Sequence, residues 1–177
     1  DDPIEKPVSP YATTKRSGEL LVFNYSHLYG LNGTCLRFFT VYGPRQRPEM
    51  GIHNFTRRIL AGEPVHIFGN GNSSRDYTYI DDIIQGVLAA LDRPKLFAIY
   101  NLGNSSQITL SRLLEIIERE CAREAKRVYL PDQPGAVPNT YADIQLASRE
   151  LDYRPQTDLE TGIARFVEWY RSGGELT

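Results

Sequence analysis

The sequence has few cysteines and no long hydrophobic run. Its 177 residues include only two cysteines, Cys35 and Cys121, and a single methionine. Two thiols so far apart do not make a disulfide framework, so a reduced, cytoplasmic protein is the simpler prediction. No apolar stretch is long enough to cross a bilayer, and no signal peptide is visible. These absences argue against a disulfide-rich secreted protein and against a membrane protein.

An excess of charge of either sign is also lacking. The chain has 20 Lys and Arg against 22 Asp and Glu, a net charge of −2. Such a balance predicts neither a nucleic-acid partner nor a membrane-surface partner. The histidines His27, His53 and His66 have no metal-ligand spacing with each other or with the cysteines, so no metal site is predicted. The hydrophobic content of 41% is that of a soluble globular protein with one proper core.

A complete dinucleotide-binding fingerprint is missing as well. Gly69-x-Gly71 has two glycines rather than three, and a strand rather than a helix is predicted after it. Phosphate binding by such a loop needs the amide groups of a helix N-terminus. The charged lead-in at residues 1–10 enters a helix with no strand–turn–helix unit before it. The sequence therefore resembles a chain that begins in the middle of a larger fold.

Hydrophobic periodicity predicts that helices and strands alternate along the chain. Helices are expected at about 10–29, 53–61, 80–91, 110–121, 144–151 and 159–170, and strands at about 34–39, 65–68, 75–79, 98–102 and 128–130. Thr109, Asp143 and Asp158 are candidate helix caps. Residues 40–51 read as a loop because of Gly43-Pro44 and Pro48. This alternation predicts an α/β fold with a parallel sheet.

Tyr11 and Lys15 are the most informative pair of side chains. They are four residues apart in a predicted helix, so they lie on the same face. An ammonium beside a phenol favours the phenolate, which can take a proton from a sugar or alcohol hydroxyl. A Tyr-x-x-x-Lys pattern alone is more often a surface pair on an ordinary helix. The same helix is expected to pack through the stripe Gly18, Val22, Tyr25 and Tyr29.

Two arginines follow loops and are candidate anion ligands. Arg47 follows the Gly-Pro loop and Arg75 follows the Gly-Asn loop. A guanidinium fork matches phosphate or carboxylate, but solvated ion pairs with neighbours such as Glu49 and Asp76 are equally compatible. Asp81 and Asp82 are better explained as acids favoured by a helix N-terminus than as a catalytic dyad. Cys35 lies in an apolar strand and is read as a core residue rather than a nucleophile.

Four stretches together are similar to one known family. They are SPYATTK at 9–15, LRFFTVYGPR at 36–45, RDYTYIDD at 75–82 and TYAD at 140–143. Their order and spacing resemble the C-terminal half of the extended short-chain dehydrogenase/reductases, the NAD-dependent nucleotide-sugar epimerases and dehydratases. The subgroup that looks most similar is UDP-glucuronate 4-epimerase.

The resemblance implies the C-terminal portion of an extended Rossmann-type fold with its small substrate-binding domain. Residues 1–45 would form the tail of the Rossmann sheet with the Tyr-x-x-x-Lys helix. Residues 46–177 would be mainly the substrate-binding domain, with 80–102 returning to the Rossmann part. The glycine fingerprint of the family and a Ser/Thr that binds the sugar O4 hydroxyl would precede Asp1. The chain by itself would then lack most of the NAD site and be inactive.

The resemblance also implies roles for individual residues. Tyr11 would be the general base that takes the sugar O4 proton while hydride leaves C4 for NAD. Lys15 would be its electrostatic partner and bind the nicotinamide ribose, and Phe39 would touch the nicotinamide. The substrate-binding residues would be Thr40 at the sugar, Arg47 at the uronate carboxylate, Ile67 and Phe68 at uracil, Arg75 at the diphosphate, and Gln133 in a loop that closes over the nucleotide.

The expected reaction is therefore epimerisation of UDP-glucuronate to UDP-galacturonate through a 4-keto sugar. The alternatives are a UDP-glucuronate decarboxylase, another UDP-hexose epimerase, a dTDP-sugar dehydratase, or a non-catalytic module that binds nucleotide or dimerises. Family enzymes commonly pair through the helix of the Tyr-x-x-x-Lys motif, so a homodimer is implied. The second face of that helix carries Leu20, Leu21 and Leu28, which agrees with such a contact.

Overall fold

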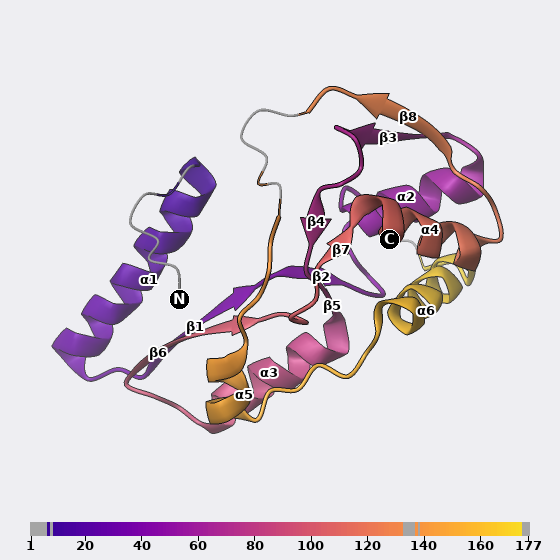
Figure 1. Cartoon of the computed structure of the whole chain (residues 1–177). Coiled ribbons are helices and arrows are strands. Elements are labelled where there is room, and N and C mark those ends of the chain that lie inside the picture. The colour runs from indigo at the N-terminus through magenta and orange to yellow at the C-terminus, as the bar shows by residue number, and fades with distance from the viewer. Residues whose placement is uncertain (1–6, 8, 133–136, 138, 175–177) are drawn as a thin grey trace.

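The computed structural model describes residues 7, 9–132, 137 and 139–174. Within these ranges helices and strands alternate along most of the chain (Figure 1). Their order is α1 (Pro10–Tyr29), β1 (Gly33–Phe38), β2 (Thr40–Tyr42), α2 (Gly51–Ala61), β3 (Pro64–Phe68), β4 (Ser74–Arg75), β5 (Tyr77–Tyr79), α3 (Ile80–Asp92), β6 (Phe97–Leu102), β7 (Ile108–Thr109), α4 (Leu110–Cys121), β8 (Lys126–Leu130), α5 (Gln145–Leu151) and α6 (Leu159–Arg171).

Local signals account for the ends of the helices. The Ser9 side chain accepts a hydrogen bond from the Ala12 amide at 3.1 Å, and Pro10 fills the first helical position of α1. Gly30 ends that helix in the left-handed conformation, with φ at 67°. Asp158 caps α6 through the Thr161 amide at 2.7 Å. The predicted helices are thus confirmed, with ends that differ by a few residues.

In the part of the chain that the structure describes, three of the four strand pairs are parallel. β1 pairs with β6 from Gly33↔Phe97 to Phe38↔Leu102, while β2 pairs with β5 and β3 with β8. The short pair of β4 and β7 is antiparallel. Parallel strands joined by helices confirm the predicted α/β class.

The sequence prediction missed the two-residue strand β7 and was wrong about residues 40–42 and 75–79. Residues 40–42 form β2 rather than loop, because the Thr40 amide donates to the Asp76 carbonyl at 3.0 Å and the strand pairs with β5. The predicted strand 75–79 is interrupted at Asp76, whose buried carboxylate binds other parts of the chain. Both differences arise from partners that are distant in sequence.

Of the stripe predicted for the packed face of helix α1, only Val22 is partly buried. Tyr25 and Tyr29 are 57% and 66% exposed. The docked face runs through Glu19, Val22 and Ser26 instead: the Glu19 carboxylate binds the Arg37 guanidinium of β1, and the Ser26 hydroxyl donates to a carbonyl of the α3–β6 connection. Helix α1 has apolar residues on more than one face. The polar contacts of Glu19 and Ser26 determine which of these faces packs against the sheet.

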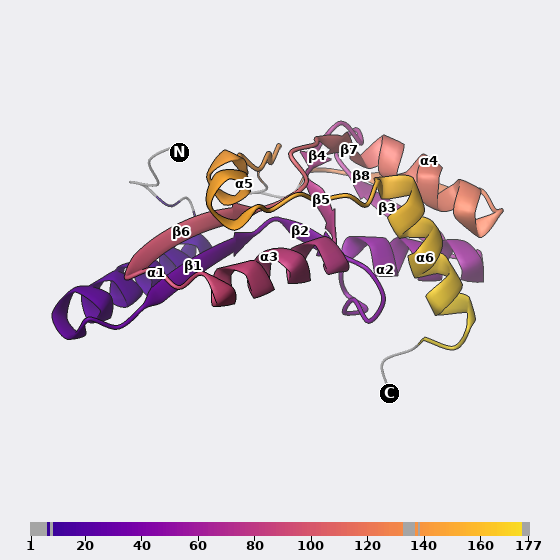
Figure 2. The ribbon, with the colours of Figure 1, turned by 90° about the horizontal axis from the view of Figure 1, so that it is seen from below.

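The buried side chains form two separate clusters. One joins α3, β6 and α5 and contains Ile83, Ala90, Tyr100, Leu102, Ala147, Leu151 and Tyr153. The larger one joins β2, β3 and β5 to α2, α4 and α6, with Phe166 and Ile117 fully buried. Figures 1 and 2 show α1 with β1 and β6 at one end of the molecule and α2, α4 and α6 at the other. The predicted division at residue 45, with 80–102 returning, stays a prediction.

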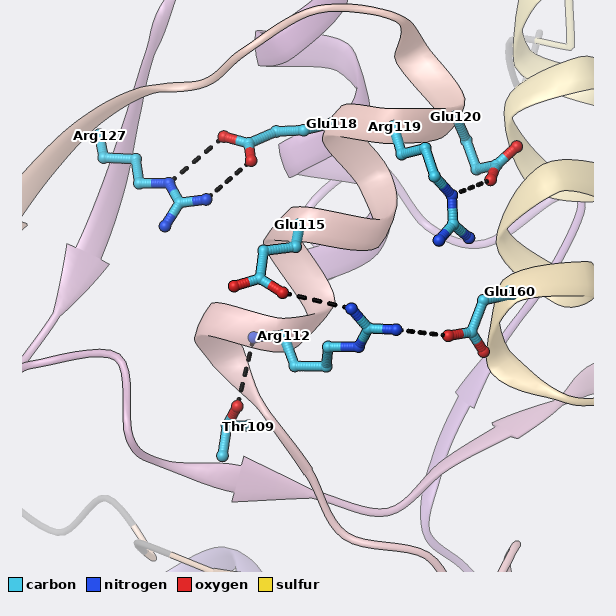
Figure 3. A network of polar contacts seen from close by, with 8 residues as sticks. All are labelled: Thr109, Arg112, Glu115, Glu118, Arg119, Glu120, Arg127 and Glu160. Carbon is cyan, nitrogen blue, oxygen red and sulfur yellow. Dashed lines mark hydrogen bonds and ion pairs between the residues drawn. The ribbon is translucent and has the colours of Figure 1, made fainter.

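Two carboxylates, those of Asp82 and Glu118, bind helices to other segments of the chain. Asp82, in the first turn of α3, is 8% exposed and accepts the amides of Gln156 and Thr157 at 3.0 and 3.1 Å. This agrees with its interpretation as a helix-start acid and adds a link to the segment before α6. Glu118 of α4 binds Arg127 of β8 through two contacts, the shorter of 2.7 Å (Figure 3). The first set of contacts connects α3 to the segment before α6, and the second connects α4 to β8.

Candidate functional site

Two cavities lie side by side and share one residue, Arg75. The α1–β2 cavity, of about 830 Å³, is lined by Tyr11, Arg37, Phe38, Phe39, Thr40, Val41, Met50, Arg75, Asn101, Thr140, Tyr141 and Asp143. The α2–β3 cavity, of about 810 Å³, is lined by Gly51, Asn54, Phe55, Arg58, His66, Phe68, Asn70, Asn72, Ser73, Arg75, Leu110, Asp132, Val137 and Asn139. Ligand-binding pockets of proteins typically have volumes of about 300–1,000 Å³, so each of these cavities is large enough to hold a small-molecule ligand.

Tyr11 and Lys15 lie together at the rim of the α1–β2 cavity. Tyr11 is 72% exposed and belongs to the cavity wall. The Lys15 ammonium lies 5.4 Å from the centroid of the Tyr11 ring, a distance at which a cation is attracted to an aromatic face. The i, i+4 spacing therefore brings the two side chains together, and the hydroxyl of Tyr11 remains accessible.

Phe39 and Thr40 line the same cavity from the junction of β1 and β2. The Phe39 amide donates to Leu102 at the end of β6, at 3.1 Å. This junction therefore lies at the carboxyl ends of the parallel pair β1–β6, the edge where open α/β sheets bind their ligands. The structure thus places both residues on the cavity wall, as expected for residues that contact a ligand.

Arg75 stands between the two cavities. One guanidinium nitrogen donates to the Ser74 carbonyl at 2.8 Å, and the side chain is half-buried. A planar guanidinium shared by two adjoining cavities can bind an anionic group that bridges their occupants.

Ile67 and Phe68 point to opposite sides of β3. Ile67 is 1% exposed and belongs to the hydrophobic core, whereas Phe68 is 42% exposed and lines the α2–β3 cavity. Successive side chains of a strand alternate between faces, so only one of two neighbours can reach the cavity. The structure places the side chain of Phe68 there and turns that of Ile67 into the core.

Arg47 lies on an exposed loop and lines neither cavity. Its guanidinium makes an ion pair with Glu49 at 3.3 Å, and both side chains are more than 60% exposed. Its neighbour Met50 does line the α1–β2 cavity. The structure therefore shows the solvated pair that the sequence left open, with the loop beside the cavity. Gln133 lies outside the described residues.

Several cavity residues were missed by the sequence reasoning. Phe55 of α2, Asn139 and Tyr141 are the clearest cases. Tyr141 belongs to the family pattern at residues 140–143, but nothing in the composition of that stretch indicates a position on the cavity wall. Phe55 lies one helical turn from Ile59 and packs against the same core, so its hydrophobic spacing predicted a core residue and gave no signal of the cavity.

The remaining nucleophile candidates are not poised to react. Burial raises the pKa of the Cys35 thiol. It also raises the pKa of the Cys121 thiol, to about 11, so both thiols stay protonated at neutral pH. Burial also raises the pKa of Tyr77 to about 12. Among the described residues no group of His, Cys, Asp and Glu could hold a metal ion. No helix of the described part is both long and apolar enough to span a bilayer.

Comparison with known proteins supplies the family. The chain is 46% identical to UDP-glucuronate 4-epimerase 4 of Arabidopsis thaliana, over 97% of this chain and 43% of that protein. It also resembles the crystal structures of UDP-glucuronic acid 4-epimerase from Bacillus cereus with UDP-glucuronic acid and NAD (TM-score 0.91, 37% identity, 97% of this chain, 55% of that chain) and of UDP-glucose 4-epimerase from Thermotoga maritima with UDP-glucose (TM-score 0.90, 35% identity, 96% and 56%).

The chain spans about half the length of the curated relatives it matches, between 43% and 56% of each of eight such proteins. The sequence model of the NAD dependent epimerase/dehydratase family matches residues 1–103, a range that contains the Tyr11–Lys15 pair, the β1–β2 junction and Arg75. This 177-residue chain belongs to the NAD dependent epimerase/dehydratase family.

Proposed function

We propose that the chain is the C-terminal, UDP-sugar-binding part of an NAD-dependent UDP-sugar 4-epimerase that converts UDP-glucuronate to UDP-galacturonate through a 4-keto sugar. The observation that carries the proposal is Arg75, which joins a cavity containing Tyr11 and Thr40 to a cavity containing Phe68. A UDP-sugar has the matching order of groups: a sugar, an anionic diphosphate and a planar base.

Within this proposal Tyr11 holds and moves the reacting proton. Its phenolate takes the proton of the sugar O4 hydroxyl as the 4-keto sugar forms, and the resulting phenol returns that proton to O4 when the C4–H bond is remade on the opposite face. The Lys15 ammonium, 5.4 Å from the centre of the same ring, is placed to offset the negative charge of the phenolate before it accepts that proton. Thr40, beside Tyr11 on the cavity wall, offers a hydroxyl to the sugar.

The residues at this rim fit a nicotinamide cofactor. A phenol, an ammonium and the aromatic ring of Phe39 provide donors for a ribose and a surface for a flat ring. NAD, when bound, supplies the acceptor of the hydride from sugar C4. Tyr11 and Lys15 would hold its ribose, and Phe39 would touch its ring.

The α2–β3 cavity would receive the nucleotide. Phe68 and Phe55 present aromatic surface to a uracil ring, and Asn139 offers an amide for its polar edge. Arg75 would bind the diphosphate at the passage to the sugar. Binding of UDP to the chain, lost or weakened at least about tenfold in Arg75→Ala, would support this arrangement. Unchanged UDP affinity in the variant would contradict it.

Selection of a uronate is assigned to Arg47 and Thr40. Arg47 would leave its ion pair with Glu49 and bind the substrate carboxylate instead. Both side chains of the pair are exposed, and their loop borders the α1–β2 cavity through Met50. One charge-assisted bond contributes about 1.5–3 kcal/mol, or roughly ten- to a hundredfold in affinity. Arg47→Ala should therefore weaken UDP-glucuronate more than UDP-glucose in calorimetric titrations.

The competing function is UDP-glucose 4-epimerase, which the similarity to the Thermotoga maritima enzyme favours. A wild-type chain that prefers UDP-glucose, or an Arg47→Ala variant that weakens both ligands equally, would select that function instead. Glu49→Gln is the matched control, because it frees Arg47 without removing the guanidinium and should not weaken UDP-glucuronate.

The 177-residue chain should bind a UDP-sugar without turning it over. It contains no glycine fingerprint that places a helix N-terminus at a dinucleotide pyrophosphate. We therefore expect NAD binding weaker than about micromolar by calorimetry and no formation of UDP-galacturonate. Sub-micromolar NAD affinity would contradict this. In a longer protein with the complete NAD site, Tyr11→Phe should lower the rate about 10²–10⁴-fold.

A further inference from the structure

Asp76 carries a carboxylate that is completely buried and touches neither cavity. Its Oδ1 accepts the Asn104 amide at 2.7 Å and the Thr78 hydroxyl at 3.2 Å, and its Oδ2 accepts the Ala142 amide at 3.2 Å. Hydrogen bonds to a charged acceptor are stronger than those between neutral groups. One buried charge is thus shared between two segments that are far apart in the sequence.

The backbone of Asp76 makes two further links. Its carbonyl accepts the Thr40 amide at 3.0 Å, and its amide donates to the Thr140 hydroxyl at 3.3 Å. Thr40 and Thr140 both line the α1–β2 cavity, as does the preceding residue, Arg75. A residue outside the cavity therefore binds two of the segments that form its wall and directly follows Arg75, which belongs to a third.

Packing around the carboxylate leaves little room for movement. A Cβ added at Gly103 would lie 2.2 Å from the Ala142 Cβ and 3.3 Å from both oxygens of Asp76. The Ser105 hydroxyl also donates to the Ala142 carbonyl, at 2.6 Å. The turn after β6 and the segment of residues 140–142 are therefore held directly against Asp76.

This arrangement presents Tyr141 to the cavity. Thr140 and Ala142, on either side of it, are bonded to Asp76, and Ala142 is fully buried. Tyr141 between them is 56% exposed and lines the α1–β2 cavity, so the bonds to Asp76 fix the backbone on both sides of a cavity residue.

We propose that Asp76 is a positioning residue for the sugar side of the ligand site, holding Thr40, Thr140 and Tyr141 in place through its buried carboxylate and backbone. The inference rests on the proposed function, because it assumes that a UDP-sugar occupies the two cavities. It assigns no ligand contact to Asp76 itself.

The test compares Asp76→Asn with Asp82→Asn in the 177-residue chain. An asparagine has one acceptor oxygen, so its amide group would face one of the two N–H donors that bind Asp76. Asp82 also binds two backbone amides while nearly buried, but the segment it holds precedes α6 and lines neither cavity. Asp82→Asn therefore controls for a loss of stability alone.

Calorimetric titration with UDP and with UDP-glucuronate gives the first readout. Asp76→Asn should lower the affinity for UDP-glucuronate at least about tenfold and the affinity for UDP by no more than about threefold. The reason is that the segments held by Asp76 line the sugar side of the site. Asp82→Asn should change neither affinity more than about twofold. Equal weakening of UDP-glucuronate in both variants would overturn the proposal. A wild-type chain that binds neither ligand would refute the proposed function, and this inference with it.

Amide hydrogen exchange without ligand tests directly whether Asp76 holds the segments of Asn104 and Ala142 in place. Asp76→Asn should speed exchange of the Asn104 and Ala142 amides at least about tenfold, whereas Asp82→Asn should act on Gln156 and Thr157 instead. Unchanged protection of Asn104 and Ala142 in Asp76→Asn would overturn the proposal, even if the chain binds UDP-glucuronate as proposed.

Discussion

At the residue scale, a close approach between Gly162 and Tyr42 sets how tightly α6 packs. A Cβ at Gly162 would lie 2.1 Å from the Tyr42 hydroxyl, and Tyr42 is 1% exposed. The buried ring cannot move aside freely, since it also packs edge-on against Tyr79. The position requires glycine because the neighbouring aromatic side chain already fills the space.

We therefore expect Gly162→Ala to lower the free energy of unfolding by about 1–3 kcal/mol, the usual cost of overpacking a core. Gly18→Ala is the matched control: it also lies within a helix, but no atom lies within 4 Å of its added Cβ. That change should stabilise the chain by up to about 1 kcal/mol. Urea denaturation of both variants measures the difference, and similar effects at the two sites would contradict the packing argument.

At the scale of single elements, α1 is attached to the sheet by an ion pair. Glu19 accepts two bonds from Arg37, at 2.6 and 2.9 Å, and one from Arg16 at 2.9 Å. The bond from Arg37 is the main cause that holds the pKa of Glu19 below its ordinary value. The pKa of Glu19 is thus lower in the folded chain than in the unfolded chain. The ion pair therefore stabilises the fold fully above the unfolded pKa of about 4.3, and this stabilisation is lost as the pH falls through the pKa of the folded state.

Glu19→Gln should accordingly cost about 1.5–3 kcal/mol of unfolding free energy at pH 7 and much less near pH 3. The exposed pair of Asp152 and Arg154 provides the control. Asp152→Asn should cost about 0–1 kcal/mol at neutral pH. Denaturation curves recorded from pH 7 to pH 3 test this; a cost of Glu19→Gln that is constant with pH would show that the ion pair does not stabilise α1.

Helix α4 is joined to β8 by one glutamate. Glu118 binds Arg127 and also accepts the Ala125 amide at 2.8 Å, with its side chain only 17% exposed (Figure 3). Glu118→Gln should lower the unfolding free energy by about 1–3 kcal/mol. The nearby pair of Arg119 and Glu120 is more exposed, so Arg119→Ala should stay within about 0.5 kcal/mol. Chemical denaturation of the two variants distinguishes them, and a reversed order would refute the assignment.

At the scale of the whole molecule, α1 leaves an apolar face uncovered. Leu21, Tyr25, Leu28 and Tyr29 are each more than half exposed. Adjacent exposed apolar side chains of this kind mark interaction surfaces. The sequence resemblance implies that this helix pairs with a second copy, and the exposed face agrees with that expectation.

We expect Leu28→Glu to shift a dimer toward monomer in size-exclusion chromatography with light scattering, because it puts a charge into a dehydrated contact. Leu91→Glu is the control, since Leu91 of α3 is also about 70% exposed but lies on another helix. A wild-type chain that remains monomeric at high concentration, or a dimer that is disrupted only by Leu91→Glu, would contradict a contact through α1.

Part of the candidate site could be predicted from the sequence. Tyr11 and Lys15 share a helix face, so their spacing alone brought them together. The placement of Phe39, Thr40 and Arg75 on a cavity wall followed from a family resemblance, since nothing local to these residues signals a ligand. The role of Arg47 stays a prediction, because its observed partner is Glu49.

By itself, the sequence determined the helices, the α/β class and the Tyr11–Lys15 pair, because caps, glycine stops and 3.6-residue periodicity act over a few residues. Only the tertiary structure decided which face of α1 docks, that β2 is a strand, and that Phe68 rather than Ile67 reaches the cavity. The proposed role of Asp76 also depends on the tertiary structure alone. Its partners Asn104 and Ala142 follow it by 28 and 66 residues, a separation over which no local pattern can act.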